Sequence, residues 1–298
     1  MKKRAVSVML TAAMVSVMLA GCGSKNAETQ SAADTTAESA VSGDETSADT
    51  QAADAETTDA ETTDASKTDG TFTVGFDQDF PPMGFVGDDG EFTGFDLEMA
   101  AEVAKRLNLT IAYQPIAWDA KDMELDAGTI DCIWNGFTMN GREDDYEWSK
   151  PYMKNNQVFV VRGDSDINSE ADLAGKNVEV QTDSSAEAAL NDNSELTSTF
   201  GNLTPVADYN TAFMDLESGA VDAIAMDDVV ASYQITSRKA DFKVLDDVIA
   251  AEEYGIGFKK GNTGLRDKVQ ATLEEMAADG TAAKISEKWF GKDITTIQ

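Results

Sequence analysis

The sequence predicts an α/β protein of two lobes with a cleft between them. Strands and helices alternate in the order β-α-β-α-β over residues 71–135, which favours a parallel sheet with helices on both faces. The alternation restarts over residues 161–253, and one strand and two helices follow it. Two α/β units joined in this way predict hinge strands near residues 157–162 and 253–258.

The N-terminal residues 1–21 have the pattern of a bacterial lipoprotein signal peptide. A basic start (Lys2 to Arg4) precedes an apolar run that is too short for a comfortable membrane span. The run ends in Leu19-Ala20-Gly21-Cys22, which is similar to the lipobox. Cys22 is therefore expected to carry lipid, palmitate included, after cleavage; the alternative is an ordinary signal peptide with a chance cysteine.

Residues 22–70 are expected to form a lipid-anchored, disordered acidic linker. They are almost entirely Ala, Thr, Ser, Asp and Glu and contain no aromatic residue, so they cannot bury enough apolar surface to fold. The formal charge of the whole chain is -32, which excludes nucleic-acid binding by phosphate neutralisation. Because an acidic chain also repels anionic lipid, the lipid on Cys22 is expected to supply the membrane attachment.

Residue types also exclude several kinds of chemistry. The chain has no histidine, and with Cys22 lipidated only Cys132 remains, which cannot form an intramolecular disulfide. Cys132 lies in an apolar strand and is expected to be a small core residue. We predict no catalytic residue, no metal, no cofactor and a monomeric chain.

In the first lobe, the run Thr71–Phe76 alternates apolar and polar residues, as a strand does. Asp96 is expected to cap a helix whose apolar residues follow a 3.6-residue period. The dipeptide Asn135-Gly136 predicts a turn at the end of a buried strand. Strands are expected at residues 71–76, 110–113 and 131–135, and helices at 96–108 and 120–127.

The second lobe and the C-terminal return follow the same kind of pattern. Strands are expected at residues 157–161, 178–181, 204–207, 223–226 and 254–259, and helices at 170–174, 185–190, 211–218, 228–238, 265–278 and 281–289. These elements predict a first lobe of residues 71–160 and 254–298 and a second lobe of residues 161–253.

Six ordered motifs make the chain similar to the polar amino-acid family of extracellular solute-binding proteins, which capture substrates for ABC importers. The resemblance covers Thr71 to Phe290 and implies a type II periplasmic-binding-protein fold, with the second lobe inserted in the first. The motifs are Val74-Gly-Phe-Asp77 with Phe80-Pro81-Pro82, Gly94-Phe-Asp-Leu97, Asp131-Cys-Ile-Trp-Asn-Gly-Phe-Thr138 with Arg142, Trp148-Ser-Lys-Pro-Tyr152, Val180-Gln-Thr-Asp-Ser-Ser185 and Val221-Asp-Ala-Ile-Ala-Met-Asp227.

The resemblance implies roles for residues at both ends of an amino-acid ligand. Arg142 lies past a buried strand and offers the planar, always-charged fork that suits the α-carboxylate. Thr138 would add a hydrogen bond, and Ser184 and Ser185 would present a helix N-terminus to the same anion. Asp227 and the carbonyl of Gly136 would take the α-ammonium.

Other residues are expected to surround the ligand side chain. The resemblance matches the aromatic residues Phe80 and Trp118 to positions that grip it, although core packing is the alternative for both. Asp77 would face a ligand side chain that carries a donor, or would cap a turn. Asn135 and Trp134 would line the pocket near Asp77. The alternatives are hydrogen bonding at the end of the strand for Asn135 and core packing for Trp134.

Two departures from the family pattern bear on the site. The segment from Thr138 to Arg142 is one residue shorter than the family pattern, with Asn140 at the second threonine position. Asp183 stands where the family usually has glycine, and it would tune selectivity or face solvent.

The function predicted by this resemblance is extracellular capture of glutamine, cystine or a basic amino acid for an ABC importer permease. Lobe closure would bring the two half-sites together. The expected location is the cell membrane, lipid-anchored on the extracellular side or facing the periplasm. The alternatives are an amino-acid sensor that serves a membrane receptor and a dehydratase-like enzyme on the same scaffold.

Overall fold

The computed structural model describes residues 70–298, which belong to one compact unit. The predicted signal peptide, Cys22 and the predicted linker up to residue 69 lie outside the described residues. Within residues 70–298 no helix is long and apolar enough to cross a membrane.

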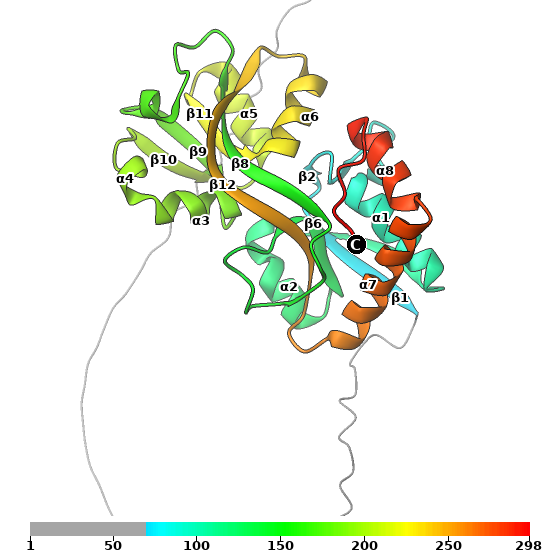
Figure 1. Ribbon diagram of the computed structural model, residues 1–298. Helices are drawn as coiled ribbons and strands as arrows, with labels where there is room; N and C mark the ends of the chain where they lie inside the picture. The colour runs from blue at the N-terminus through cyan, green and yellow to red at the C-terminus, as the bar shows by residue number, and fades with distance from the viewer. Residues whose placement is uncertain (1–69) are drawn as a thin grey trace, which may run out of the picture. The chain divides into compact units, whose positions relative to one another are not determined.

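One nine-stranded sheet connects the two halves of the molecule (Figure 1). At one end β5, β1 and β6 are parallel, and at the other end β10, β9 and β11 are parallel. The strands between them, β8 and β12, run antiparallel, so the sheet as a whole is mixed, whereas the three main strands of residues 71–138 are parallel, as predicted. The bounds are β1 Thr71–Phe76, β5 Thr110–Pro115, β6 Cys132–Thr138, β9 Asn177–Gln181, β10 Asn202–Val206 and β11 Ala223–Asp227.

The strands β8 (Met153–Arg162) and β12 (Phe242–Phe258) join the two halves. They pair along most of their length, from Phe242 opposite Arg162 to Tyr254 opposite Met153. Both predicted hinge segments lie inside these strands. The first half of β12 was not predicted, because its acidic residues interrupt the apolar pattern that marks a strand. The predicted lobe boundaries fall within β8 and near the end of β12, and they stay predictions.

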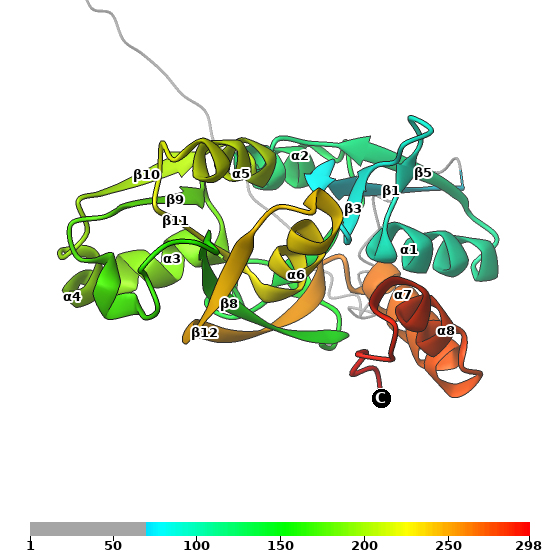
Figure 2. The ribbon, with the colours of Figure 1, turned by 90° about the horizontal axis from the view of Figure 1, so that it is seen from above.

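Helices cover both faces of the sheet, as predicted. In Figure 2, α2 and α5 lie on one side of the strands, and α1 and α6 lie on the other. The bounds are α1 Phe95–Arg106, α2 Lys121–Ala127, α3 Ser185–Asp192, α4 Ser194–Thr197, α5 Tyr209–Ser218, α6 Asp228–Arg238, α7 Thr263–Ala278 and α8 Thr281–Phe290, with short 3-10 helices at Trp118–Ala120 and Glu170–Leu173.

Four short strands were not predicted. A separate three-stranded sheet of β2 (Asp79–Phe80), β3 (Gly84–Val86) and β4 (Phe92–Thr93) follows β1, and β7 (Glu147–Trp148) pairs with β12. Strands of two or three residues contain too few residues to show an alternating pattern. These short strands fix the positions of Phe80, in β2, and Trp148, in β7.

The predicted helix cap at Asp96 and the predicted turn at Asn135-Gly136 are both wrong, because Asp96 and Gly136 form a hydrogen bond with each other. Gly94, not Asp96, occupies the N-cap position of α1, and no side chain caps this helix. The strand β6 continues through Asn135 and Gly136 to Thr138, with Gly136 at a φ of 58°, a left-handed conformation that favours glycine. Asp96 is fully buried and accepts a 2.6 Å hydrogen bond from the Gly136 N–H, so the two segments stabilise each other.

The hydrophobic core extends across the sheet into both halves. Its largest cluster includes Phe72 and Trp134 from the first half and Tyr209 and Phe213 from the second. Cys132 is a free, fully buried member of this core, as predicted, and burial raises the pKa of its thiol.

Candidate functional site

Nine of the ten predicted ligand-binding residues line one pocket between the two halves of the sheet. The pocket has a free volume of about 10 Å³, which is room for roughly one water molecule. The halves therefore lie in a closed arrangement, and an amino acid could enter only after they move apart. The lining residues are Phe80, Trp118, Asn135, Gly136, Thr138, Arg142, Gln181, Ser184, Ser185 and Asp227.

The end of β6 forms one wall of this pocket. Asn135 and Thr138 are buried, and the Asn135 side chain accepts a 3.0 Å hydrogen bond from the N–H of Asp77. Behind this wall the Asp96 carboxylate accepts hydrogen bonds from the Gly136 N–H and, at 2.9 Å, from the Tyr152 hydroxyl. Burial is the main cause that raises the pKa of Asp96 to about 7, and the two hydrogen bonds oppose it. The buried acid thus fixes the backbone that faces the pocket.

Arg142 lines the pocket although the segment that carries it is one residue shorter than the family pattern. Its guanidinium donates to the Thr138 carbonyl at 3.4 Å and to the Asp183 carbonyl at 3.3 Å. The same group lies 5.4 Å from the centre of the Phe137 ring. These contacts hold the guanidinium over the pocket without pairing it to any carboxylate among residues 70–298.

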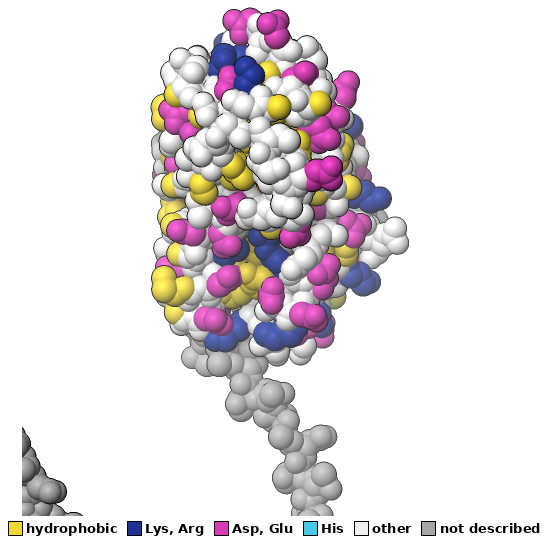
Figure 3. Space-filling model, turned by 90° about the vertical axis from the view of Figure 1, so that its left-hand side faces the viewer, with side chains coloured by type: hydrophobic (Ala, Val, Ile, Leu, Met, Phe, Trp, Pro, Cys, Tyr) yellow, Lys and Arg dark blue, Asp and Glu magenta, His cyan; other side chains and the backbone are white. Residues whose placement is uncertain are grey.

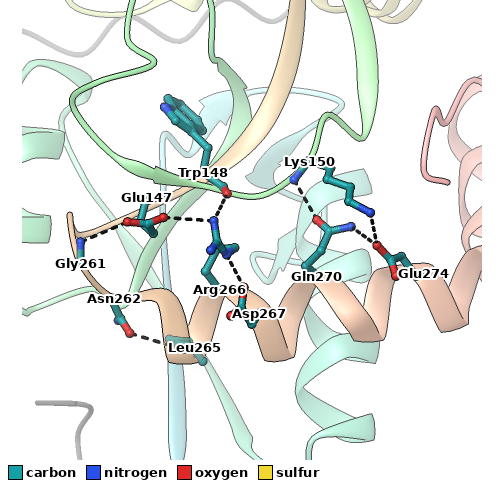
Figure 4. A network of polar contacts seen from close by, with 10 residues as sticks. All are labelled: Glu147, Trp148, Lys150, Gly261, Asn262, Leu265, Arg266, Asp267, Gln270 and Glu274. Atoms are coloured by element: carbon teal, nitrogen blue, oxygen red, sulfur yellow. Dashed lines mark hydrogen bonds and ion pairs between the residues drawn. The ribbon is translucent and has the colours of Figure 1, made fainter. Parts of the chain in front are cut away.

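The chain after Arg142 is tied to helix α7 (Figure 4). Arg266 donates to the Glu147 carboxylate at 3.1 Å and to the Trp148 carbonyl at 2.9 Å. One turn further along, Gln270 accepts from the Lys150 N–H at 2.8 Å, and the Lys150 ammonium pairs with a nearby carboxylate on the same helix. The loop that carries Arg142 is therefore anchored at its far end to a helix of the first half.

The N-terminus of α3 brings the second half of the molecule to the same pocket. Ser184 occupies the N-cap position and accepts a 3.1 Å hydrogen bond from the Glu187 N–H. The Ser185 hydroxyl accepts from Thr138 at 3.1 Å and from Gln157 at 3.0 Å. Because the first N–H groups of a helix have no intrahelical acceptor, this end of α3 favours an anion.

Asp227 ends β11, lines the same pocket and is buried among donors, one of which, Gln157, also contacts Ser185. Its Oδ1 accepts from Asn155 and Gln157, each at 2.8 Å, and from the Tyr254 hydroxyl. Burial first, and then the charge of Glu252, raise the pKa of Asp227 well above its usual range. Sequence reasoning missed Glu252, which lies in the unpredicted part of β12.

Asp77 does not line this pocket but borders a neighbouring cavity of about 520 Å³. Its Oδ1 accepts from the Asp79 N–H at 2.8 Å, as in the turn-capping alternative. Its Oδ2 accepts from Gln181 of the other half at 2.7 Å, so one carboxylate serves a turn and a cross-lobe contact. Burial is the first cause that raises the pKa of Asp77 to about 6. Gln181 lies in a motif that the sequence analysis quoted, but no role was predicted for it.

The aromatic residues Phe80 and Trp118 both pack and line the pocket. Phe80 is 6.0 Å from the ring of Tyr209, and Trp118 meets the ring of Phe137 edge-on at 5.5 Å. Trp118 also borders the larger cavity and therefore lies at the junction of the two spaces. Trp134 is fully buried in the core and lines neither space, which agrees with its core-packing alternative.

An ion pair that the sequence analysis did not predict joins the two halves beside a hollow that Arg142 also borders. The Lys121 ammonium of α2 pairs with the Asp183 carboxylate of the second half. Lys121 is only 1% exposed, and it also lies 5.4 Å from the centre of the Trp118 ring. Asp183 has a φ of 58°, a left-handed backbone conformation that explains why glycine suits this position in the family pattern.

The described residues offer no group of three or more His, Cys, Asp or Glu that could hold a metal ion. On the face shown in Figure 3, Asp and Glu side chains are spread among Lys and Arg side chains, and hydrophobic side chains form small groups.

Comparison with known proteins identifies the family to which the sequence is similar. The family model described as "Bacterial extracellular solute-binding proteins, family 3" matches residues 72–292. The chain is 34% identical over 228 residues to the L-cystine-binding protein TcyJ of Escherichia coli (strain K12), covering 76% of this chain and 84% of that protein.

Two solved structures extend the comparison. An ABC uptake transporter substrate-binding protein from Streptococcus pneumoniae with bound histidine has a TM-score of 0.74 and 35% identity, over 76% of this chain and 95% of that chain. An ancestral arginine-binding protein bound to arginine has a TM-score of 0.69 and 36% identity, over 74% of this chain and 99% of that chain.

Proposed function

Since the chain belongs to the bacterial extracellular solute-binding proteins of family 3, we propose that its pocket captures a polar amino acid for an ABC importer. The observation that carries the proposal is the separation of charge across one pocket. Arg142 and the N-terminus of α3 offer positive potential, whereas Asp227 offers negative potential. A free amino acid carries the complementary pair, a carboxylate and an ammonium on neighbouring atoms.

Each end requires groups from both halves of the molecule, which supports capture by closure. Thr138 and Arg142 come from the first half, and Ser185 and Asp227 come from the second. The Thr138 hydroxyl donates directly to Ser185 across the cleft. A ligand that bridges these groups would stabilise the closed state over the open one.

The cavity beside the pocket supports a ligand whose side chain carries a positive group. Four carboxyl-bearing residues border this cavity, and no Lys or Arg does among the described residues. The relatives named above bind cystine, histidine or arginine. We therefore place cystine and the basic amino acids ahead of glutamine as ligands. The acidic residues are Asp77, Asp79, Asp119 and Asp208.

We also propose a membrane anchor and a transport partner for the protein. A lipid on Cys22 would anchor a monomer to the outer side of the cell membrane or in the periplasm, and a permease would receive the ligand. The pattern of residues 1–22 supports the anchor. An accessory role as an amino-acid sensor remains the second candidate, because capture by closure serves signalling as well as transport.

A thermal-shift screen of the twenty amino acids and cystine tests the proposed function. A ligand that binds only the folded state raises the melting temperature, and the rise grows with affinity. We expect the largest rise with cystine, arginine, histidine or lysine. If no amino acid raises the melting temperature, the proposal is wrong. Loss of radiolabelled uptake in a deletion strain would then separate transport from sensing.

A further inference from the structure

A second buried carboxylate, that of Glu252, lies beside Asp227; it borders an outer hollow, whereas Asp227 lines the pocket itself. Glu252 is 6% exposed and Asp227 is 4% exposed. Glu252 Oε1 accepts from Asn155 Nδ2 and from Gln157 Nε2, each at 2.7 Å. Asp227 Oδ1 accepts from the same two nitrogen atoms at 2.8 Å. The two carboxylates therefore converge on one pair of amide donors.

The cluster around them has more acceptors than donors. The side-chain oxygen atoms of Asn155 and Gln157 are buried there and have no hydrogen-bond partner among residues 70–298. Thr138 Oγ1 lies 2.8 Å from Glu252 Oε1 but has a single hydrogen for both Ser185 and Glu252, and Tyr254 is the further donor to Asp227. Because buried acceptors without donors cost free energy, a group with several N–H donors and a positive charge would complete the cluster.

The residues packed against the pair do not supply that charge. Tyr209 of α5 and Tyr254 of β12 face it, and burial raises the pKa of both hydroxyls, so they are neutral near pH 7. The neighbouring acid Asp228 accepts from Asn156 and adds only negative charge. Arg142 borders an outer hollow together with Glu252, but its guanidinium donates to backbone carbonyls instead.

We propose that Glu252 is a specificity-determining residue, which together with Asp227 forms a two-carboxylate site for the α-ammonium of the ligand. The proposal rests on the proposed function and deepens it. Two carboxylates this close are not both ionised unless a cation lies against them. Without an ammonium, burial and the charge of Glu252 raise the pKa of Asp227 and keep a proton on it, and a binding ammonium displaces that proton to solvent.

This arrangement selects against ligands that lack a charged amine. A 2-hydroxy analogue brings a neutral hydroxyl, so the proton stays on Asp227 and no new charge pair forms. An amino acid brings three N–H donors and a full charge to the unpartnered acceptors. The second carboxylate therefore increases the discrimination between the two ligands beyond what Asp227 alone provides.

The experiment is calorimetric titration of the full mature chain with L-cystine, L-arginine and L-histidine, and with the 2-hydroxy analogue of each one that binds. Titrations in phosphate and in Tris buffer report the protons released per ligand. The test variant is Glu252→Gln, which keeps the volume and an acceptor oxygen. The matched control is Glu253→Gln, which makes the same charge change at the partly exposed next residue, on the other face of the strand.

For the wild type and the control we expect up to one proton released per amino acid between pH 5 and 8. We expect Glu252→Gln to reduce the release, because burial of Asp227 remains, and to reduce the preference for amino acid over hydroxy analogue about tenfold. Equal proton release and equal preference in all three proteins would overturn the role of Glu252 while leaving amino-acid capture intact. Absence of proton release from the wild type would also overturn it, whether or not the variant folds. If none of the twenty amino acids or cystine binds, the proposed function itself is overturned.

Discussion

The two ends of the pocket are built in different ways. The donor end consists of Arg142, on a partly exposed loop, and the first turn of α3. The acceptor end consists of Asp227 and Glu252, both buried in strands, with Asp96 buried behind Gly136. The donor end can change without disturbing the core, whereas the acceptor end holds carboxylates that the fold must desolvate. Ligand affinity should therefore depend on both ends, but protein stability should depend on the acceptor end.

The largest expected effect concerns stability at the acceptor end. Burial raises the pKa of Asp96 from 3.8 to about 7, so the folded protein holds a proton that the unfolded chain releases. The free energy of unfolding should therefore fall as pH rises from about 4 to about 7, by roughly 4 kcal/mol from this residue alone. Asp96→Asn should remove that part of the slope in urea titrations at several pH values. An unchanged slope would show that Asp96 does not take up this proton.

Arg142→Ala should have the largest effect on affinity and little effect on stability. Loss of a charge-assisted partner for a buried carboxylate should raise the dissociation constant roughly hundredfold or more. Arg142→Lys keeps the charge but not the planar fork, so its affinity for the ligand should lie between that of the alanine variant and that of the wild type. Calorimetry measures the affinity and thermal melting the stability. Unchanged affinity in the alanine variant would remove Arg142 from the site.

Asp227→Asn should weaken binding of free amino acids about tenfold to hundredfold. N-acetylated analogues have no charged ammonium, so their affinity should fall much less in the same variant. Calorimetry of the wild type and the variant, with each free amino acid and its N-acetylated analogue, gives the loss of affinity for both kinds of ligand. Equal losses for free and N-blocked ligands would contradict the assignment of this carboxylate to the ammonium.

Lys121→Met should have the smallest effect, since Lys121 acts on closure and not on the ligand itself. The variant keeps the length of the side chain but loses the cross-lobe pair with Asp183. We expect about a tenfold weaker affinity, mainly through faster ligand dissociation in stopped-flow measurements. A change in the association rate alone would argue against a role in holding the closed state. Lys150→Met, which removes an exposed ion pair within the first half, is the control.

Local patterns were enough to predict much of the fold. The strand Thr71–Phe76 and the helix Asp228–Arg238 have the predicted bounds, and an alternating pattern of apolar and polar residues marks the strand. The family was also predicted correctly from ordered motifs, and the match over residues 72–292 confirms it. The first half of β12 was not predicted from the sequence. It is held by backbone pairing with β8, and this pairing does not require alternating apolar residues.

The candidate site shows the same limit more clearly. Residues within motifs, such as Thr138 and Asp227, were selected in advance, and the structure brings them to one pocket. Glu252 and Lys121 gave no signal, because their importance comes from partners that are distant in sequence. Glu252 lies 114 residues from Thr138, and Lys121 lies 62 residues from Asp183. Only the pairing of β12 with β6 and β8, and the closure of the cleft, place these charges together.

The central claim is that one zwitterion bridges the two ends, and a single comparison on the unmodified protein tests it. The amino acid that gives the largest thermal shift is titrated beside two analogues, one without the α-carboxylate and one without the α-ammonium. Both analogues should bind at least roughly a hundredfold more weakly, because each leaves a buried charge unpaired. If either analogue bound within about threefold of the parent amino acid, the corresponding end of the pocket would not recognise the charge assigned to it.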